Sequence, residues 1–251
     1  RVLFRSPRVR VQASDAEAFA LFKFLDKHHR LRLVPASQVR KERTCGAFSL
    51  VKDELKDRLI VDARPANSLE STLKNYCQSL GAVSALLQLE LLPGNQLVMS
   101  GTDLRDFYYC FRVTKARARR NAFRFPLTRA QAAQFACFPA EGPEDTIWYP
   151  CLNTMAMGDN NAVELGQGAH VLLGLRAGIF KPEEMLTTHS RAPRGPLACG
   201  IIIDDIIFAE QLAVDLDLTA FTDGERRLSL MCEQYLQEGL TAHPAKTFQK
   251  S

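Results

Sequence analysis

The sequence predicts an α+β protein built from antiparallel strand pairs and amphipathic helices. Two strand pairs, at 47–61 and 201–208, are each joined by a charged turn and are rich in β-branched and aromatic residues. Apolar residues recur at helical spacing in 15–29, 68–80 and 222–239. The chain of 251 residues is long enough for one large domain or two small ones.

Composition places the chain among intracellular globular proteins. Its hydrophobic content of 46% and charged content of 24% are ordinary for that class. No run of about eighteen apolar residues exists, so we expect no membrane-spanning segment, and there is no secretory signal. Seven scattered cysteines without a C-x-x-C pair argue for reduced thiols and against a zinc site or a disulfide framework. The chain begins at Arg1 without a methionine, and we expect it to be an excerpt of a longer polypeptide.

One helix and one β-hairpin are expected in the N-terminal part of the chain. Residues 15–29 read as an amphipathic helix. Residues 47–51 and 58–61 read as strands joined by the charged turn 52–57. Basic side chains on or near the tip of this hairpin could hold a polyanion, or could simply face solvent. They are Lys52, Lys56 and Arg58.

Two helices and a strand that ends in an acid are expected in the central part. Residues 68–80 read as a helix, and 82–92 read as a second helical piece that ends before a Pro-Gly pair. Residues 96–113 read as a strand, a corner bearing acids, an aromatic cluster and a second strand. Asp103 stands at the end of the first of these strands and is a candidate metal ligand.

The C-terminal half is expected to contain a loop and two further helices. Residues 139–146 read as a loop by composition, and 162–176 read as a helix. Gly158, ahead of that helix, supplies backbone freedom where the chain approaches a ligand or bends tightly. A capping box at 222–225 opens the last helix. The residues it is expected to bury are Leu228, Met231, Cys232, Tyr235 and Leu236.

Asp204 and Asp205 stand side by side between the apolar runs 201–203 and 206–208. Adjacent carboxylates between buried strands repel each other and lose hydration, so they need a solvated turn or a nearby cation. One interpretation is a hairpin whose tip happens to be Asp-Asp, because Asp is a favoured turn residue. The other is a divalent-metal site at the tip of the hairpin, with Asp103 as a further ligand.

Basic residues gather in two stretches of the chain, although the net charge is only +4. Such runs are usually solvated faces, but two clusters of one sign are also compatible with a phosphate-rich partner. The two clusters are Arg1, Arg5, Arg8 and Arg10, and Lys115, Arg117, Arg119, Arg120 and Arg124.

Five motifs, taken in chain order, resemble those of reverse transcriptases of the retrotransposon and retroviral polymerase type. The resemblance covers roughly Gly46 to the C-terminus. The motifs are Arg58-Leu-Ile-Val-Asp62-Ala-Arg64-Pro-Ala-Asn67, Thr102-Asp103-Leu-Arg-Asp106-Phe-Tyr108, Met157-Gly158-Asp-Asn-Asn161-Ala162, Ile202-Ile203-Asp204-Asp205 and Gly239-Leu-Thr-Ala-His-Pro-Ala-Lys246.

The resemblance implies a right-hand polymerase fold, with fingers and an antiparallel palm sheet backed by helices, and with the thumb absent or truncated. On this reading residues 1–45 are a helical lead-in. The fingers comprise 46–92 and 116–158, and the palm comprises 93–115 and 159–251.

The implied activity is RNA-directed DNA polymerisation, in which a dNTP is joined to a primer 3′-OH on an RNA or DNA template. Two Mg²⁺ ions, or Mn²⁺ in their place, would lower the charge cost of the attacking oxygen and of the departing pyrophosphate. By resemblance Asp103 and Asp204 would bridge the ions and Asp205 would assist. The oligomeric state and the compartment within the cell (cytoplasm, nucleus or element particle) stay open.

The resemblance also assigns residues to the nucleotide. Arg58 and Lys52 would clamp the triphosphate, with Lys56 as a competitor for the place of Lys52. Tyr108 would be an aromatic gate that excludes a 2′-hydroxyl, and Lys246 would be a proton donor near the pyrophosphate. The remaining expected nucleotide contacts are Asp106, Met157 and Gly158.

Three positions depart from the family pattern. Ile202 replaces a tyrosine that many relatives carry, and Met157 replaces a glutamine or an aromatic residue. Asp159 adds a negative charge beside the expected nucleotide site, and the sequence offers no account of it.

Two alternative functions share these motifs. A catalytically silent domain derived from a retroelement would bind nucleic acid without incorporating nucleotides. An RNA-templated RNA polymerase would share the palm but would use ribonucleotides, against the interpretation of Tyr108.

Overall fold

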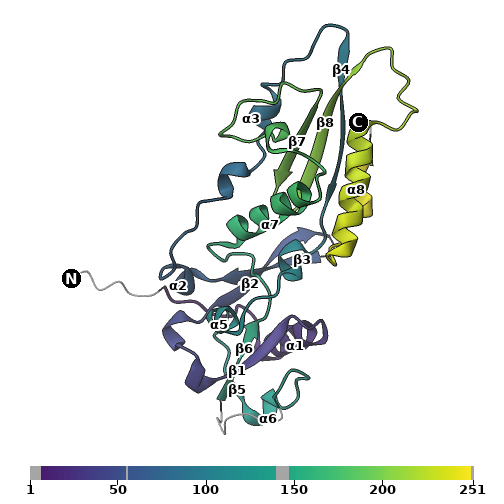
Figure 1. The fold of residues 1–251 in the computed structure, drawn as a ribbon. Helices are drawn as coiled ribbons and strands as arrows, with labels where there is room; N and C mark the ends of the chain where they lie inside the picture. Colours follow the sequence, from purple (N-terminus) through teal and green to yellow (C-terminus); the bar gives the residue numbers. More distant parts are fainter. Residues whose placement is uncertain (1–6, 55, 140–146, 250–251) are drawn as a thin grey trace, which may run out of the picture. The chain divides into compact units, whose positions relative to one another are not determined.

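The computed structural model describes residues 7–54, 56–139 and 147–249 (Figure 1). The chain is a mixed α+β protein with antiparallel sheets, which confirms the predicted class. It divides into two compact units: Arg1–Thr72 with Tyr108–Ala162, and Leu73–Phe107 with Val163–Ser251. The assignment of stretches to fingers and palm stays a prediction. Arg1, Arg5 and the expected loop after Pro139 lie outside the described residues.

The first unit has its core around an antiparallel sheet in the order β1-β6-β5. β1 (Leu31–Pro35) pairs along its whole length with β6 (Ile147–Leu152), and β5 (Leu127–Thr128) lies along the other edge of β6. α1 (Asp15–Lys27) confirms the expected helix, and Ser14 opens it with a capping box. Large side chains of this core are Phe22, Phe123, Leu127, Trp148 and Leu152.

The predicted hairpin of the first unit is confirmed. β2 (Gly46–Asp53) and β3 (Lys56–Asp62) pair antiparallel, from Gly46 opposite Asp62 to Asp53 opposite Lys56. The turn is shorter than the expected 52–57, because β2 continues through Lys52, where the register shifts. The short helices of this unit are α2 (Arg64–Asn67), α5 (Lys115–Arg120), α6 (Arg129–Ala132), η1 (Ala36–Gln38) and η2 (Lys41–Arg43).

The prediction of a helix over 68–80 is wrong. α2 ends at Asn67, and only the 3-10 turn η3 (Cys77–Ser79) falls within that range. The buried carboxylate of Glu164 accepts hydrogen bonds from the backbone amides of residues 75–77. These amides therefore cannot donate to the carbonyl ladder that a helix requires.

The second unit contains an antiparallel sheet in the order β7-β8-β4-β9. β7 (Leu197–Ile202) and β8 (Asp205–Ala213) confirm the second predicted hairpin. β4 (Asn95–Asp103) pairs with β8 from Asn95 opposite Ala213 to Asp103 opposite Asp205. β9 (Phe248–Gln249) lies on the other edge of β4.

Two long helices accompany this sheet. α7 (Ala162–Arg176) confirms the helix expected there, and α8 (Asp223–Gln237) contacts β8 and β4 (Figure 1). A capping box at Thr222 starts α8 as predicted. Its expected core residues Leu228, Met231 and Tyr235 are buried, whereas Leu236 is 71% exposed and was wrongly predicted to be buried.

Two further expectations need correction. Helix α3 covers only Val83–Leu86 of the expected 82–92. The aromatic cluster after β4 forms the short helix α4 (Phe107–Cys110), and no strand is assigned after it within 108–113, where Arg112 makes an isolated bridge.

The other 3-10 turns are η4 (Pro182–Glu184) and η5 (Pro244–Lys246). None of the helices in the described ranges combines the length and the apolar character that crossing a membrane requires.

Candidate active site

The three candidate metal ligands lie at one end of the sheet of the second unit. Asp103, the last residue of β4, is paired with Asp205, the first residue of β8. Asp204 lies in the turn between β7 and β8, and its carbonyl accepts a hydrogen bond from the amide of Leu104 at 3.0 Å. The strand pairing of β4 with β8 therefore brings together carboxylates from distant parts of the sequence.

The electrostatics of this end of the sheet disfavour the ionised acids. Burial and the charges of Asp103 and Asp205 raise the pKa of Asp204 to about 6. Burial and the charge of Asp103 likewise raise the pKa of Asp205. The ionised forms of Asp204 and Asp205 are thus destabilised by burial and by neighbouring negative charge, as expected for like charges that are partly withdrawn from water.

Lys246 supplies a positive charge to the acids. Its Nζ donates a hydrogen bond to Oδ2 of Asp103, and this bond is the main cause of the raised pKa of Lys246. The backbone amide of His243 donates to the carbonyl of Asp103 at 2.7 Å, which anchors η5 beside β4. From the resemblance, Lys246 was expected near the pyrophosphate as a proton donor, and that role stays a prediction.

The donor set suits a hard divalent cation. Three carboxylates that repel one another are stabilised by an ion that prefers oxygen ligands, such as Mg²⁺ or Mn²⁺. In the part of the chain that the structure describes, no three carboxylate, imidazole or thiol groups already converge as a ligand set. Because Lys246 bonds to Oδ2 of Asp103, an ion at this carboxylate would compete with the ammonium group for that oxygen.

The turn that carries Asp204 is strained. Ile203 has a φ of 59°, a conformation that is a genuine outlier for a β-branched residue and costs about 1–3 kcal/mol. Its amide donates to Oε1 of Gln167 at 2.8 Å, and its carbonyl accepts from Nδ1 of His170 at 2.7 Å. Hydrogen bonds contribute about 0.5–1.5 kcal/mol each, so these two bonds offset most of the strain.

Gln167 and His170, which bond to this turn, were not predicted as site residues from the sequence. Both lie on α7 and are buried, with exposures of 0% and 1%. Nε2 of His170 lies 2.5 Å from the hydroxyl of Tyr235 on α8, and burial lowers the pKa of His170 to about 4. The signal that could have revealed the pair is their spacing of three residues in an otherwise apolar helix, where buried polar groups need partners.

The three consecutive aromatic residues after Asp103 differ in how deeply they are buried. Phe107 is buried in the second unit, and its ring lies 5.8 Å from that of His170. Tyr108 and Tyr109 are half-buried in the first unit, where Tyr109 contacts the guanidinium of Arg30. Phe107 is therefore the core aromatic residue of the three, and Tyr108 as a sugar gate stays a prediction.

Asp106 precedes α4 and is exposed, with a φ of 51° that Asp tolerates better than most residues. The amide of the neighbouring Arg105 donates to the carbonyl of Thr241 at 2.8 Å. This bond ties the corner after β4 to the segment that leads to Lys246.

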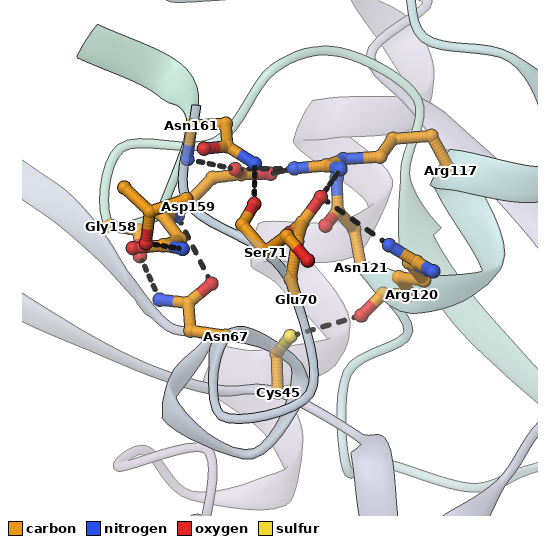
Figure 2. Close-up of polar contacts among 12 residues, drawn as sticks. Cys45, Asn67, Glu70, Ser71, Arg117, Arg120, Asn121, Gly158, Asp159 and Asn161 are labelled. Carbon is orange, nitrogen blue, oxygen red and sulfur yellow. Dashed lines mark hydrogen bonds and ion pairs between the residues drawn. The ribbon is translucent and has the colours of Figure 1, made fainter. Parts of the chain in front are cut away.

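Gly158 packs against β3 within the first unit. The amide of Val61 donates to the carbonyl of Met157 at 3.2 Å. Gly158 has a φ of 105°, and a Cβ atom there would lie 2.4 Å from the carbonyl oxygen of Val61. The side chain of Asn67 donates to the Gly158 carbonyl at 2.8 Å and accepts from the Asn160 amide at 3.0 Å (Figure 2). Glycine is thus required by a contact within the protein, and Asn67 joins two of the predicted motifs.

Asp159 is accounted for by an internal ion-pair network (Figure 2). Nη2 of Arg117 donates to both carboxylate oxygens of Asp159 at 2.5 and 2.6 Å, and Nη1 of Arg117 donates to Glu70. Arg120 also contacts Glu70, at 3.3 Å. Burial alone would lower the pKa of Arg117, but its bonds to Asp159 and Glu70 raise it. The charge of Asp159 is therefore neutralised, and two members of the basic cluster pair with acids inside the unit.

The two basic residues expected at the triphosphate are exposed on the hairpin of the first unit. Lys52 lies at the register shift in β2, and Arg58 on β3 pairs with Leu50. Nearby, Arg64 forms an ion pair with Asp62 at 2.7 Å. The acids, in contrast, belong to the second unit.

No model of a known protein family matches this chain, and a search of curated proteins also finds no match.

Proposed function

We propose that the chain is the fingers and palm of a retroelement reverse transcriptase, an RNA-directed DNA polymerase. The observation that carries the proposal is the end of the β4–β8 pair, where Asp103 lies opposite Asp205 and pairs with Lys246, and where Asp204 precedes Asp205 in the turn. The order of the five motifs along the chain supports the same assignment. Fold class alone would not, because an α+β sheet with helices serves many functions.

In the proposed reaction, each of these residues has a separate task. Asp103 and Asp204 would hold two Mg²⁺ ions, and Asp205 would assist. Bound there, the ions would supply Lewis acidity to the attacking and departing oxygens. Lys246 would release Asp103 and donate a proton toward the departing pyrophosphate.

Other residues would select and hold the nucleotide. Arg58 and Lys52 would neutralise the charge that develops on the transferred phosphates. Tyr108 would exclude a 2′-hydroxyl and so favour deoxynucleotides. These three assignments rest on the resemblance of the motifs.

The proposal is tested by primer extension on an RNA template with Mg²⁺, using the full-length protein. Asp204→Asn/Asp205→Asn should reduce incorporation about a hundredfold or more. Asp215→Asn/Asp217→Asn removes the same charge from the exposed segment after β8 and should leave incorporation unchanged. Full activity of the first double variant would contradict the assigned mechanism.

The same assay separates the alternatives. Template binding without incorporation, with either Mg²⁺ or Mn²⁺, would indicate a nucleic-acid-binding protein without catalysis. Equal use of ribonucleotides and deoxynucleotides would indicate an RNA polymerase and would refute the role of Tyr108.

A further inference from the structure

The turn between β7 and β8 depends on side chains from outside the hairpin. Ile203 occupies a left-handed conformation with a φ of 59° immediately before Asp204. β-branched residues rarely adopt this conformation, and it persists only where surrounding contacts enforce it. The direction in which Asp204 and Asp205 leave the turn depends on this one residue, because a change in its φ would rotate both of them.

Gln167 fixes this turn by bonding to both of its sides. Its Oε1 accepts from the amide of Ile203 at 2.8 Å, and its Nε2 donates to the carbonyl of Ile201 at 3.1 Å. Nε2 also donates to the carbonyl of Ser79 at 3.0 Å. One buried amide therefore joins α7 to the end of β7 and to the first residue of the turn.

His170 holds the carbonyl of Ile203 in a defined tautomer. A carbonyl oxygen only accepts, so Nδ1 of His170 carries the proton and donates across the 2.7 Å contact. Nε2 is then the acceptor for the hydroxyl of Tyr235 at 2.5 Å. The relay from Tyr235 through His170 to Ile203 joins α8, α7 and the turn.

We infer that Gln167 and His170, backed by Tyr235, are positioning residues that set the direction of Asp204 and Asp205. None of the three is a candidate ligand or nucleotide contact. Their polar atoms meet the backbone of one strained residue, and packing of α7 alone would not require those bonds. The catalytic consequence of this inference rests on the proposed function, but the effect of the three residues on the turn can be measured without catalysis, as a change in Mn²⁺ affinity.

The test uses the full-length protein and three variants of the relay. Gln167→Met and His170→Leu remove the bonds to Ile203 at similar volume. His170→Gln keeps an N–H donor and should recover most of the function. Leu228→Ala is the control, because Leu228 is buried on α8 two turns from Tyr235 and should lower stability without altering the turn.

Two measurements are made on each variant. Mn²⁺ binding without nucleotide, followed by electron paramagnetic resonance, should weaken about tenfold in Gln167→Met and His170→Leu, as for residues that orient metal ligands. The kcat for incorporation should fall about tenfold or more, with the KM for dNTP within about twofold of the unsubstituted value, because ligand geometry acts on the chemical step. Leu228→Ala should change neither quantity.

The outcomes are separable. If Gln167→Met and His170→Leu both fold and both keep the Mn²⁺ affinity and the kcat of the unsubstituted protein, the inference is overturned. An equal loss of Mn²⁺ affinity and kcat in Leu228→Ala would also overturn it. If His170→Leu does not fold, Tyr235→Phe removes only the outer hydroxyl, and an unchanged Mn²⁺ affinity in that variant would also overturn it. An unsubstituted protein that binds Mn²⁺ but incorporates no nucleotide would refute the proposed function, and Mn²⁺ affinity would still decide the positioning role.

Discussion

Replacing Arg117 by Met should strongly destabilise the first unit. The substitution leaves the carboxylates of Asp159 and Glu70 without their shared guanidinium. The side chains of Asp159 and Glu70 are only 4% and 13% exposed, so neither charge is well hydrated. Loss of one partner from such a buried pair costs about 3–5 kcal/mol. Because Arg120 remains near Glu70, we expect about 3 kcal/mol, at the lower end of that range.

The unfolding assay has a natural probe in Trp148, the one tryptophan of the chain. Trp148 is fully buried in β6 of the first unit, so its fluorescence during urea denaturation follows the unfolding of that unit. Asp159→Asn should cost only about 1–2 kcal/mol, because it removes a bond without leaving a buried carboxylate unpaired. The double variant with Arg117→Met should therefore cost less than the two single changes added together.

The matched control is Arg226→Met, which removes an Arg–Asp pair on the exposed face of α8. Because α8 belongs to the second unit, its unfolding is followed by far-ultraviolet circular dichroism alongside the fluorescence of Trp148. Arg226 and its partner Asp223 have side chains 56% and 37% exposed, and such pairs contribute at most about 1 kcal/mol. Equal effects of Arg117→Met and Arg226→Met would refute the argument that the network around Asp159 stabilises the unit.

Three further predictions follow from the geometry. Gly158→Ala should cost more stability than Gly178→Ala, because both have positive φ but only the first would place a Cβ against a backbone oxygen, at 2.4 Å; equal urea midpoints would contradict this. His170 binds a proton at a pKa of 6.5 in the unfolded chain but only near 4 in the folded chain, so the free energy of unfolding decreases as the pH is lowered. The difference in this free energy between the unsubstituted protein and His170→Gln should therefore shrink by about 2 kcal/mol from pH 7.5 to pH 5.0 in parallel denaturation curves. Lys246→Met frees Asp103 and should lower the Mn²⁺ concentration for half-maximal thermal stabilisation a few-fold, since the side chain of Lys246 is 54% exposed and an ion pair with such a partner contributes about 1 kcal/mol. A higher concentration would show that Lys246 does not compete with the ion.

Elements with their own local signals could be predicted from the sequence. α1 and α8 have capping boxes and apolar faces, so their starts and buried sides follow from spacing alone. The two hairpins are β-branched runs around charged turns, and both are present. The acids of the candidate site could be named for the same reason, because Asp204 and Asp205 interrupt an apolar run.

Features that depend on contacts between distant residues could not be predicted. Leu69 and Leu73 have helical spacing but are 58% and 42% exposed, because Glu164 binds the backbone amides that follow them. Similarly, the ion-pair partner of Asp159 is Arg117, which lies more than forty residues away in the sequence. Periodicity carries no information about such pairs, and tertiary contacts override it.

The two units alternate along the chain, so no single cut separates them. During synthesis, β1 can pair with β6 only after more than a hundred further residues have been made, and the same holds for β4 and β8. Closing such long segments is entropically costly and slows folding. A nascent chain that stops before α7 contains almost all of the first unit but leaves β4 without β8, so β4 stays unpaired until the C-terminal third emerges. A fragment that is to contain both folded units therefore has to extend beyond β8.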